Sequence, residues 1–318
     1  MDVMMAVRAH SRGGPERLLY EQAPQPEAGE GEVLVAVHAA AITFDELTWE
    51  ESWTRDGVDR TPVIPSHEMC GTVAALGDGV TDLAIDDDVF ALIDFDRNGA
   101  AAEYVTVPAV DLAGKPRMVS HVEAATLPLA ALTAWQALVD HAKLMPGEQV
   151  LVHGGAGGVG VYAVQLATIL GGHVTATCRG TDASFVRRLG ADRVIDYTTE
   201  GFDETASRFD VVVDTVGGAI LERSYGVLRP GGRLVTLGAP PAKEMANRHG
   251  VEAVFFIVRP DSAQLAHLAQ LVDDGRLRPV VAQTFPLSQA RQAYENPGRE
   301  HRPGKTVLVI RGLDRAGE

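Results

Sequence analysis

Cysteine is scarce in this 318-residue chain, which contains only Cys70 and Cys178. Two thiols cannot form a disulfide framework or a four-thiolate zinc site. No apolar run approaches the ~20 residues that span a bilayer, and the first residues show no secretory signal pattern. These absences lead us to expect a cytoplasmic protein that does not insert into membranes.

Positive charge is also scarce: the chain has 28 Lys and Arg residues but 43 Asp and Glu residues, which gives a net charge of −15. Such a surface repels nucleic acid and anionic membranes, so neither is expected as a partner. A hydrophobic content of 46% and a charged content of 22% are ordinary for a globular protein. The length exceeds that of one average hydrophobic core, which indicates two domains.

Glycine, in contrast, is concentrated directly after the apolar, β-branched run 149–153, where five of the next seven residues are glycines. The pattern predicts a buried strand, a tight loop and then a helix with almost no charge. Gly155, Gly157 and Gly160 fit Gly-x-Gly-x-x-Gly between that strand and that helix. These glycines permit a tight turn, a close approach to a pyrophosphate and close helix–strand packing. Because N–H groups at a helix start hold phosphates, we predict a dinucleotide site rather than a ligand-free loop.

Strands and helices alternate after this loop. Strands are predicted at 173–177, 193–196, 209–214, 232–237 and 251–258, with helices at 182–189 and 218–228 between them. Such alternation is typical of right-handed βαβ crossovers and a doubly wound parallel sheet.

The first 120 residues have a different pattern, with short strands at 3–7, 32–39, 71–76 and 88–93 and frequent Gly and Pro between them, which predicts a partly open β-barrel. Helical character is predicted over 40–53 and over 122–141, where Pro128 should bend or divide the helix. A helix at 263–273 and a strand at 305–310 close the chain. We therefore predict an α/β protein with a barrel domain at 1–121, a dinucleotide domain at 122–260, and a return to the barrel at 261–318.

The choice of dinucleotide depends on the end of the second strand of the dinucleotide domain, where an acid binds a ribose 2′-OH or an arginine accepts a 2′-phosphate. Arg179 occupies that position, and the first acid, Asp182, falls where a helix N-cap belongs. The pattern favours NADP(H) over NAD(H). The alternative is that Arg179 is a solvated surface residue.

Several stretches resemble the zinc-independent quinone oxidoreductase branch of the medium-chain dehydrogenase/reductase superfamily. They are VLVHGGAGGVGVYAVQLA, RRLGADRVIDY, DVVVDTVGG, RPGGRLVTLG, LTAWQAL and GKTVLVI, in the expected order. The resemblance implies a GroES-like barrel, an inserted Rossmann domain, and NADPH-dependent reduction of quinones or activated C=C bonds. It also implies that Tyr197 contacts the adenosine phosphate and Thr133 the nicotinamide region. The predicted cofactor contacts are Gly155, Ala156, Gly157, Gly158, Val159, Gly160, Arg179, Tyr197, Val216, Leu237, Gly238, Phe256 and Ile257.

No metal site is expected. Zinc-dependent relatives carry a Cys-His pair where Thr43 and Phe44 stand here, and only His67-Glu68 remains of the zinc pattern. One imidazole without thiolates cannot form a Cys₂His site, so we interpret His67 as a hydrogen-bonded residue lining the cleft. Cys70 is interpreted as a small buried hydrophobe. Quinone reductases tend to have asparagine at the position of Thr43, which leaves the substrate contact there open.

The candidates for substrate contact or proton transfer are Thr43, Asp45, Trp49, His67 and Thr133, with Phe44 and Trp53 as walls for a flat substrate. Three of these residues have a structural alternative: Asp45 as an acid in a helix first turn, and Trp49 and Trp53 as core residues one helical turn apart. No residue stands out from the sequence as an obligate acid or base.

Three function classes follow from these patterns. A reductase of quinones, enones or enals is the first, a zinc alcohol dehydrogenase the second, and a non-catalytic NADPH-binding protein the third. The apolar stretch 251–258 falls at the edge of the predicted sheet, and relatives commonly pair that strand across a two-fold axis. We therefore expect a homodimer, with a monomer whose edge is covered by residues 245–250 as the alternative.

Overall fold

The computed structural model describes residues 2–204, 208–295 and 302–311. The chain divides into two compact units, Met1–Leu129 with Arg259–Glu318, and Ala130–Val258. The sequence had suggested divisions after residues 121 and 260, so the contact boundaries fall eight residues later and two residues earlier. No helix in the described ranges has both the length and the apolar character of a membrane span.

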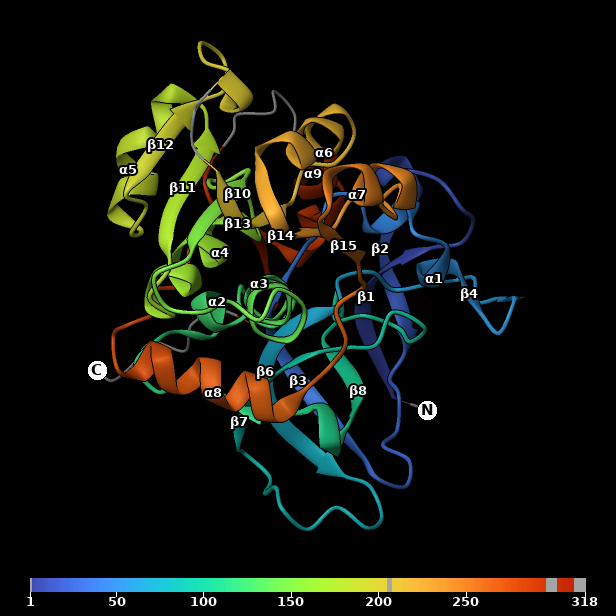
Figure 1. Cartoon of the computed structure of the whole chain (residues 1–318). Helices are drawn as coiled ribbons and strands as arrows, with labels where there is room; N and C mark the ends of the chain where they lie inside the picture. The colour runs from blue at the N-terminus through green and yellow to red at the C-terminus, as the bar shows by residue number, and fades with distance from the viewer. Residues whose placement is uncertain (1, 205–207, 296–301, 312–318) are drawn as a thin grey trace. The chain divides into compact units, whose positions relative to one another are not determined.

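The Ala130–Val258 unit is built on one six-stranded sheet (Figure 1). Its strands are β10 (Gln149–His153), β11 (His173–Cys178), β12 (Arg193–Asp196), β13 (Phe209–Asp214), β14 (Leu228–Thr236) and β15 (Glu252–Phe255). They lie in the order β12-β11-β10-β13-β14-β15, and every neighbouring pair is parallel. Numbered within the unit this order is 3-2-1-4-5-6, which defines a Rossmann sheet and confirms the predicted fold class.

The helices of this unit cover that sheet. They are α3 (Ala130–Trp135), the π-helix η4 (Gln136–His141), α4 (Gly160–Ile169), α5 (Ala183–Arg188), α6 (Ala219–Ser224) and α7 (Lys243–His249), with 3₁₀ turns η5 (Gly180–Asp182), η6 (Phe202–Glu204) and η7 (Tyr225–Val227). In α4 every residue from Gly160 to Ala167 is buried, which explains why this helix has no charged residue. Helix α4 packs on β10 and β11, α5 on β11 and β12, α6 on β13 and β14, and α7 on β15.

The strands of the other unit pair antiparallel, as expected for a GroES-like barrel, except for the last two along the chain, which pair in parallel. The strands are β1 (Val3–Ala9), β2 (Leu18–Pro24), β3 (Glu32–Ala41), β4 (Thr54–Arg55), β5 (Val58–Asp59), β6 (Glu68–Leu76), β7 (Asp88–Leu92), β8 (Tyr104–Pro108), β9 (Ala113–Gly114), β16 (Val281–Pro286) and β17 (Lys305–Val309). Its helical segments are η1 (Pro15–Arg17), η2 (Glu46–Thr48), α1 (Glu50–Trp53), η3 (Ala109–Asp111), α2 (His121–Ala124), α8 (Ser262–Asp273), η8 (Leu287–Gln289) and α9 (Ala290–Glu295).

Strand β3 organises the barrel unit, because it pairs with β6 along its length, with β8 near its start and with β17 near its end (Figure 1). The pairing of β17 with β3 brings the C-terminal part of the chain back to its first strands, as the sequence predicted. The strands β2, β8 and β16 were not predicted. In β2 and β16 apolar and polar residues are mixed without alternation, so no strand period stands out, whereas β8 does alternate buried Val105 and Val107 with half-buried residues and carried a short strand signal.

The helix predicted over 40–53 is wrong. Strand β3 continues to Ala41, and only η2 and the single turn α1 follow it. Trp49, between them, has an extended backbone with φ −79° and ψ 133°, so it does not share a helical turn with Trp53. Pairing with β6 and β17 outweighs the helical propensity of the alanines at the end of β3. Trp53 is 2% exposed and its indole N–H donates to the carbonyl of Leu47, so it packs in the core instead of forming a wall.

Candidate functional site

The loop between β10 and α4 has the geometry that its glycines predict. A Cβ on Gly160 would lie 2.0 Å from the carbonyl oxygen of Gly154, so only glycine fits where α4 begins. A Cβ on Gly155 would lie 2.9 Å from that of Ala176 in β11. Gly154 has φ +70°, a conformation that favours glycine. The chain therefore turns tightly from β10 into α4 and lies close to β11.

This loop fits a phosphate group. In the described chain the N–H groups of Ala156, Gly158 and Val159 donate to no carbonyl, and they lie at the start of the ten-residue helix α4. Free N–H groups and the helix dipole together stabilise an anion there. A Cβ on Gly157 would meet only the Gly154 carbonyl oxygen, at 3.2 Å. The loop thus provides donors without side chains in the way.

Buried polar side chains hold the glycine loop in place through hydrogen bonds. The Gly154 N–H donates to Thr177 Oγ1 at 3.2 Å, and the same hydroxyl lies 3.3 Å from His153 Nδ1. Burial lowers the pKa of His153, so its ring is neutral and bridges Thr177 to Ser224 on α6. Asp214, fully buried at the end of β13, accepts the N–H groups of two residues in the next loop at 3.0 Å each. These contacts hold both loops in one conformation.

The predicted cofactor residues all follow the carboxyl ends of the six parallel strands. The glycine loop follows β10, Arg179 follows β11, Tyr197 follows β12, Val216 follows β13, Leu237 and Gly238 follow β14, and Phe256 and Ile257 follow β15. Because the strands are parallel, these ends lie along one edge of the sheet, where ligands of such sheets bind. Val216 and Ile257 are 56% and 53% exposed, so both are open to a ligand.

Arg179 and Tyr197 lie together at the ends of neighbouring strands. Arg179 Nε donates to the Tyr197 hydroxyl at 3.0 Å, and Tyr197 is 51% exposed. This hydrogen bond raises the pKa of Arg179 above its ordinary value, so the guanidinium stays charged. Its remaining N–H groups make no hydrogen bond in the described chain, so they are available to an anion.

In the barrel unit, Glu46 forms the centre of a buried polar cluster that the sequence did not indicate. It is 2% exposed, and its carboxylate accepts hydrogen bonds from the Tyr294 hydroxyl at 2.6 Å and from the backbone N–H groups of Thr43 and Ser66 at 3.1 and 2.8 Å. Burial raises the pKa of Glu46 to about 7. One side chain thus ties together the segment after β3, the segment before β6 and helix α9.

Lys305 lies behind Thr43 in the same cluster. It is 5% exposed, its ammonium group lies 2.5 Å from Glu68, and it donates to Thr43 Oγ1 at 2.9 Å. The other oxygen of Glu68 accepts the Leu129 N–H at 3.0 Å. Thr43 is half-buried, and its own hydroxyl hydrogen finds no acceptor among the described residues. The Thr43 hydroxyl is therefore a donor with a buried cation behind it.

His67 is 3% exposed at the start of β6, and its Nδ1 is buried without a hydrogen-bond partner in the described chain. Burial, and to a smaller extent the charge of Arg60, lowers the pKa of His67 to about 4, so the ring is neutral near pH 7. Ser66, directly before it, has φ +73°, a strained conformation for a residue with a side chain. A neutral imidazole cannot serve as a cationic general acid.

The other candidates lie in three different settings. The Phe95 ring meets those of Trp49 and His67 edge to face at 5.3 and 5.2 Å, so Phe95 joins two candidates that are 18 residues apart. Asp45 is exposed before η2 and makes no side-chain capping bond, and Phe44 is 45% exposed. Thr133 lies on α3 in the other unit, where it is 4% exposed.

The residues present do not fit a catalytic zinc ion. Across residues 2–204, 208–295 and 302–311 there is no group of three or more His, Cys, Asp or Glu side chains that could hold a metal. Cys70 is fully buried in β6, and burial raises the pKa of its thiol well above the ordinary value. It behaves as the small buried hydrophobe that the sequence suggested.

These two arrangements, a Rossmann sheet with an open glycine loop and a barrel with a buried polar cluster, define a nicotinamide-dependent oxidoreductase. Comparison with known families agrees. The alcohol dehydrogenase GroES-like domain family matches residues 29–117, and the zinc-binding dehydrogenase family matches residues 189–308.

Individual relatives match over nearly the whole chain. A probable zinc-binding mitochondrial oxidoreductase of Arthroderma benhamiae is 32% identical over 90% of this chain and 91% of its own length. The mitochondrial NAD(P)H oxidoreductase RTN4IP1 of Danio rerio is 30% identical over 88% and 84%. The chloroplastic quinone-oxidoreductase QR1 of Triphysaria versicolor is 30% identical over 93% and 95%. The solved structure of the quinone oxidoreductase from Coxiella burnetii has a TM-score of 0.90 at 30% identity and covers 98% of this chain and 100% of its own.

The chain therefore belongs to the medium-chain dehydrogenase/reductase superfamily, and it is an oxidoreductase that uses a nicotinamide cofactor.

Proposed function

We propose that this protein is an NADPH-dependent reductase that transfers a hydride to a quinone or to an activated C=C bond without zinc. The observation that carries the proposal is the Arg179–Tyr197 pair beside the open glycine loop. A charged guanidinium beside a phenol hydroxyl suits a 2′-phosphate, whereas a 2′-hydroxyl would need a carboxylate there. The same strand ends would hold the rest of the dinucleotide.

The cofactor, when bound, supplies the hydride, and residues of the protein donate the proton to the reduced substrate. We assign the proton donor to the Thr43 hydroxyl, which would protonate the oxygen that becomes negative in the reduced substrate. Lys305 would then return a proton to Thr43 Oγ1 through their 2.9 Å hydrogen bond, and Glu68 would keep the ammonium group in place. Glu46 positions Thr43 through its backbone N–H. His67, Trp49, Asp45 and Thr133 remain candidates for contacts to the substrate or the nicotinamide.

The proposed function is tested by following NADPH and NADH oxidation with a panel of quinones, enones and enals. We expect turnover with at least one class, preference for NADPH, and full activity after exhaustive chelation. A stoichiometric zinc whose removal abolishes activity would favour the alternative, a zinc alcohol dehydrogenase. Tight NADPH binding with no turnover on any acceptor would favour a non-catalytic NADPH-binding protein.

We also propose a homodimer paired through β15, which lies at one end of the six-stranded sheet. An unpaired edge invites a second strand, and a two-fold axis would satisfy both copies. Helix α7 packs against β15 and could cover that edge instead. Light scattering decides, since a mass near 33.8 kDa would exclude the dimer. A cytoplasmic location stays a prediction, because the relatives compared above include mitochondrial and chloroplastic proteins.

A further inference from the structure

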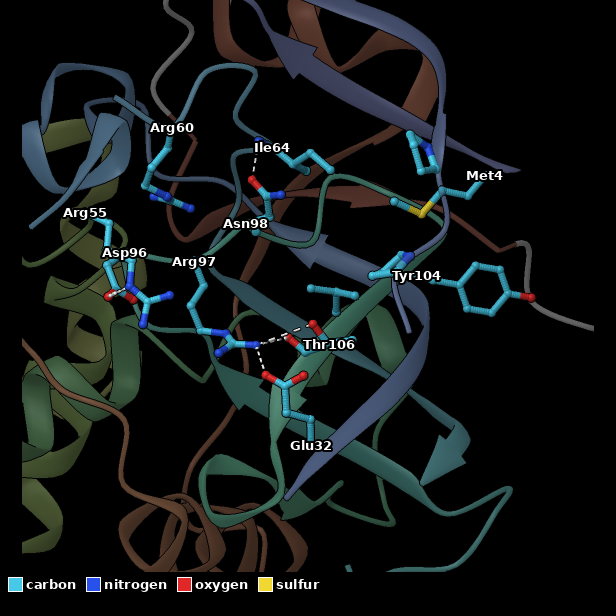
Figure 2. Close-up of a pocket in the computed structure, with 14 residues that line it drawn as sticks. Met4, Glu32, Arg55, Arg60, Ile64, Asp96, Arg97, Asn98, Tyr104 and Thr106 are labelled. Carbon is cyan, nitrogen blue, oxygen red and sulfur yellow. Dashed lines mark hydrogen bonds and ion pairs between the residues drawn. The ribbon is translucent and has the colours of Figure 1, made fainter. Parts of the chain in front are cut away.

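The barrel unit contains a cavity of about 410 Å³ that shares no residue with the site described above. Figure 2 shows its lining, with the arginines on one side of the view and Met4 and Tyr104 on the other. The charged residues of the lining are Glu32, Arg55, Arg60, Asp96 and Arg97. Three cations and two anions thus face one cavity in a chain whose net charge is −15.

Arg97 is only partly satisfied by its neighbours. One of its terminal nitrogens forms a close ion pair with Glu32 and lies 3.4 Å from the Thr106 hydroxyl (Figure 2). Its Nε is buried and has no hydrogen-bond partner in the described chain. An unsatisfied buried N–H costs free energy unless a further acceptor reaches it. The protein therefore leaves one donor of a cavity-lining arginine unsatisfied.

Arg60 has no carboxylate partner among the described residues. A single terminal nitrogen donates to the backbone carbonyls of Phe95, Ser52 and Glu51 at 3.1, 3.3 and 3.4 Å. Burial lowers the pKa of Arg60, the nearby Asp96 carboxylate raises it, and the positive charges of Arg55 and Arg97 lower it. The two carboxylates of the lining thus offset only part of the charge of its three guanidinium groups, and a bound anion would offset the rest.

Arg55 is the third arginine of the cavity lining, and its side chain is exposed. Its Nε lies 3.2 Å from Asp96, and its side chain is 59% exposed. An ion pair this exposed contributes little to stability, and its terminal nitrogens stay available. The forked geometry of a guanidinium matches phosphate and carboxylate oxygens in pairs, so three such groups suit one compact oxyanion.

We propose that this cavity is a binding site for a small organic oxyanion, with its phosphate or carboxylate group among Arg55, Arg60 and Arg97 and its apolar part toward Met4 and Ile64. The volume suits a ligand of this kind, because small-molecule sites begin at about 300 Å³. None of the lining residues is among those that we propose to bind NADPH.

The test is a calorimetric titration of the full-length protein with phenyl phosphate and with benzoate, at low and high salt. We expect saturable one-to-one binding of at least one probe, weakened by salt because the contact is electrostatic. The probe that binds with the lower Kd shows whether the site prefers a phosphate or a carboxylate group. Arg55→Glu and Arg60→Gln should each weaken binding about tenfold or more. Arg193→Gln, which alters an exposed arginine paired with Glu200, should leave it unchanged.

Two results would overturn the proposal. One is the absence of saturable binding by both probes. The other is binding that survives Arg55→Glu and Arg60→Gln but disappears in Arg179→Ala, which would place the anion on the Rossmann sheet. Arg60 supports backbone carbonyls, so its variant could unfold. Arg55→Glu, at an exposed side chain, tests the site without that risk, and circular dichroism confirms that each variant is folded.

Discussion

The two units hold their functional groups in opposite ways. In the Rossmann unit the glycine loop is one run of seven residues, 154–160, and its available donors are backbone N–H groups. In the barrel unit the polar cluster joins side chains that are far apart along the chain, since Glu46 and Tyr294 are 248 positions apart and Thr43 and Lys305 are 262 apart. The first arrangement depends on residues that lack a side chain, and the second depends on buried side chains that satisfy one another.

This difference predicts different weaknesses. A backbone site is damaged by any added atom that moves the chain, whereas a side-chain cluster is damaged by removing one polar group from it. The substitutions below test that contrast.

The largest effect is expected from Gly160→Val. Its Cβ would lie 2.0 Å from the Gly154 carbonyl oxygen, so the loop or the start of α4 must move. We expect dinucleotide binding to fall below detection and unfolding free energy to drop by about 1–3 kcal/mol. Fluorescence titration with NADPH and urea unfolding measure the two effects. Gly226→Ala is the matched control, because a Cβ there meets no atom within 4 Å. A fully active Gly160→Val protein would show that the loop is not the phosphate site.

Next in size is Thr43→Val, which removes the proposed proton donor while keeping the shape. We expect kcat to fall about a hundredfold with a smaller change in KM, since a positioned general acid contributes about 10²–10⁴. Thr43→Ser should retain most activity, and Thr54→Val, on β4, should be neutral. The pair Lys305→Met with Glu68→Gln removes both charges together and leaves neither unpaired. If the three groups act in one relay, adding Thr43→Val to the double variant should lower kcat only slightly further. Independent, additive losses would contradict the relay.

Stability should depend on pH through Glu46. Its pKa in the folded protein is raised to about 7 from 4.5, so between these values the folded state keeps a proton that the unfolded state has lost. Rising pH therefore destabilises the protein, by about 2 kcal/mol between pH 5 and pH 8 relative to Glu46→Gln. His67, whose pKa is lowered to about 4, acts in the opposite direction below pH 6.5 but is present in both proteins. Urea unfolding of wild type and Glu46→Gln at several pH values measures the difference. If the unfolding free energies of the two proteins change with pH in parallel, Glu46 does not cause the pH dependence.

The smallest effect is expected from Arg179→Ala, because this arginine is on the surface. We expect the Kd for NADPH to rise about tenfold while that for NADH hardly changes, since only NADPH has the 2′-phosphate. Arg193→Ala, on the neighbouring strand β12, is the control. Wild-type protein that binds NADH and NADPH equally well would remove the basis for the NADPH preference.

The Rossmann unit could be predicted from the sequence in detail. Strands β12 and β13 have the bounds that their apolar runs indicate, and β10 ends where the glycines begin. Just before this unit begins, Pro128 lies between α2 of the barrel unit and α3, so the helix predicted over 122–141 is divided there. Each of these features depends on residues within a few positions of one another, so the local pattern carries the information.

The barrel unit was harder to predict for the opposite reason. The stretch 40–53 has helical composition, yet its first two residues pair with β6 and β17, and Trp53 packs in the core. No local signal marks Glu46 as buried, because an acid beside another acid suggests a solvated surface. Its burial depends on hydrogen bonds from Tyr294 on α9 and from the backbone N–H groups of Thr43 and Ser66.

The sequence by itself determined the Rossmann sheet, the glycine loop and the superfamily, because glycine spacing and apolar periodicity act through neighbouring residues. The tertiary structure alone decided which polar groups are buried together and which cations share a cavity. Glu46, Lys305 and the three arginines acquire their chemistry from partners on other strands and helices, and burial strengthens those contacts by removing water.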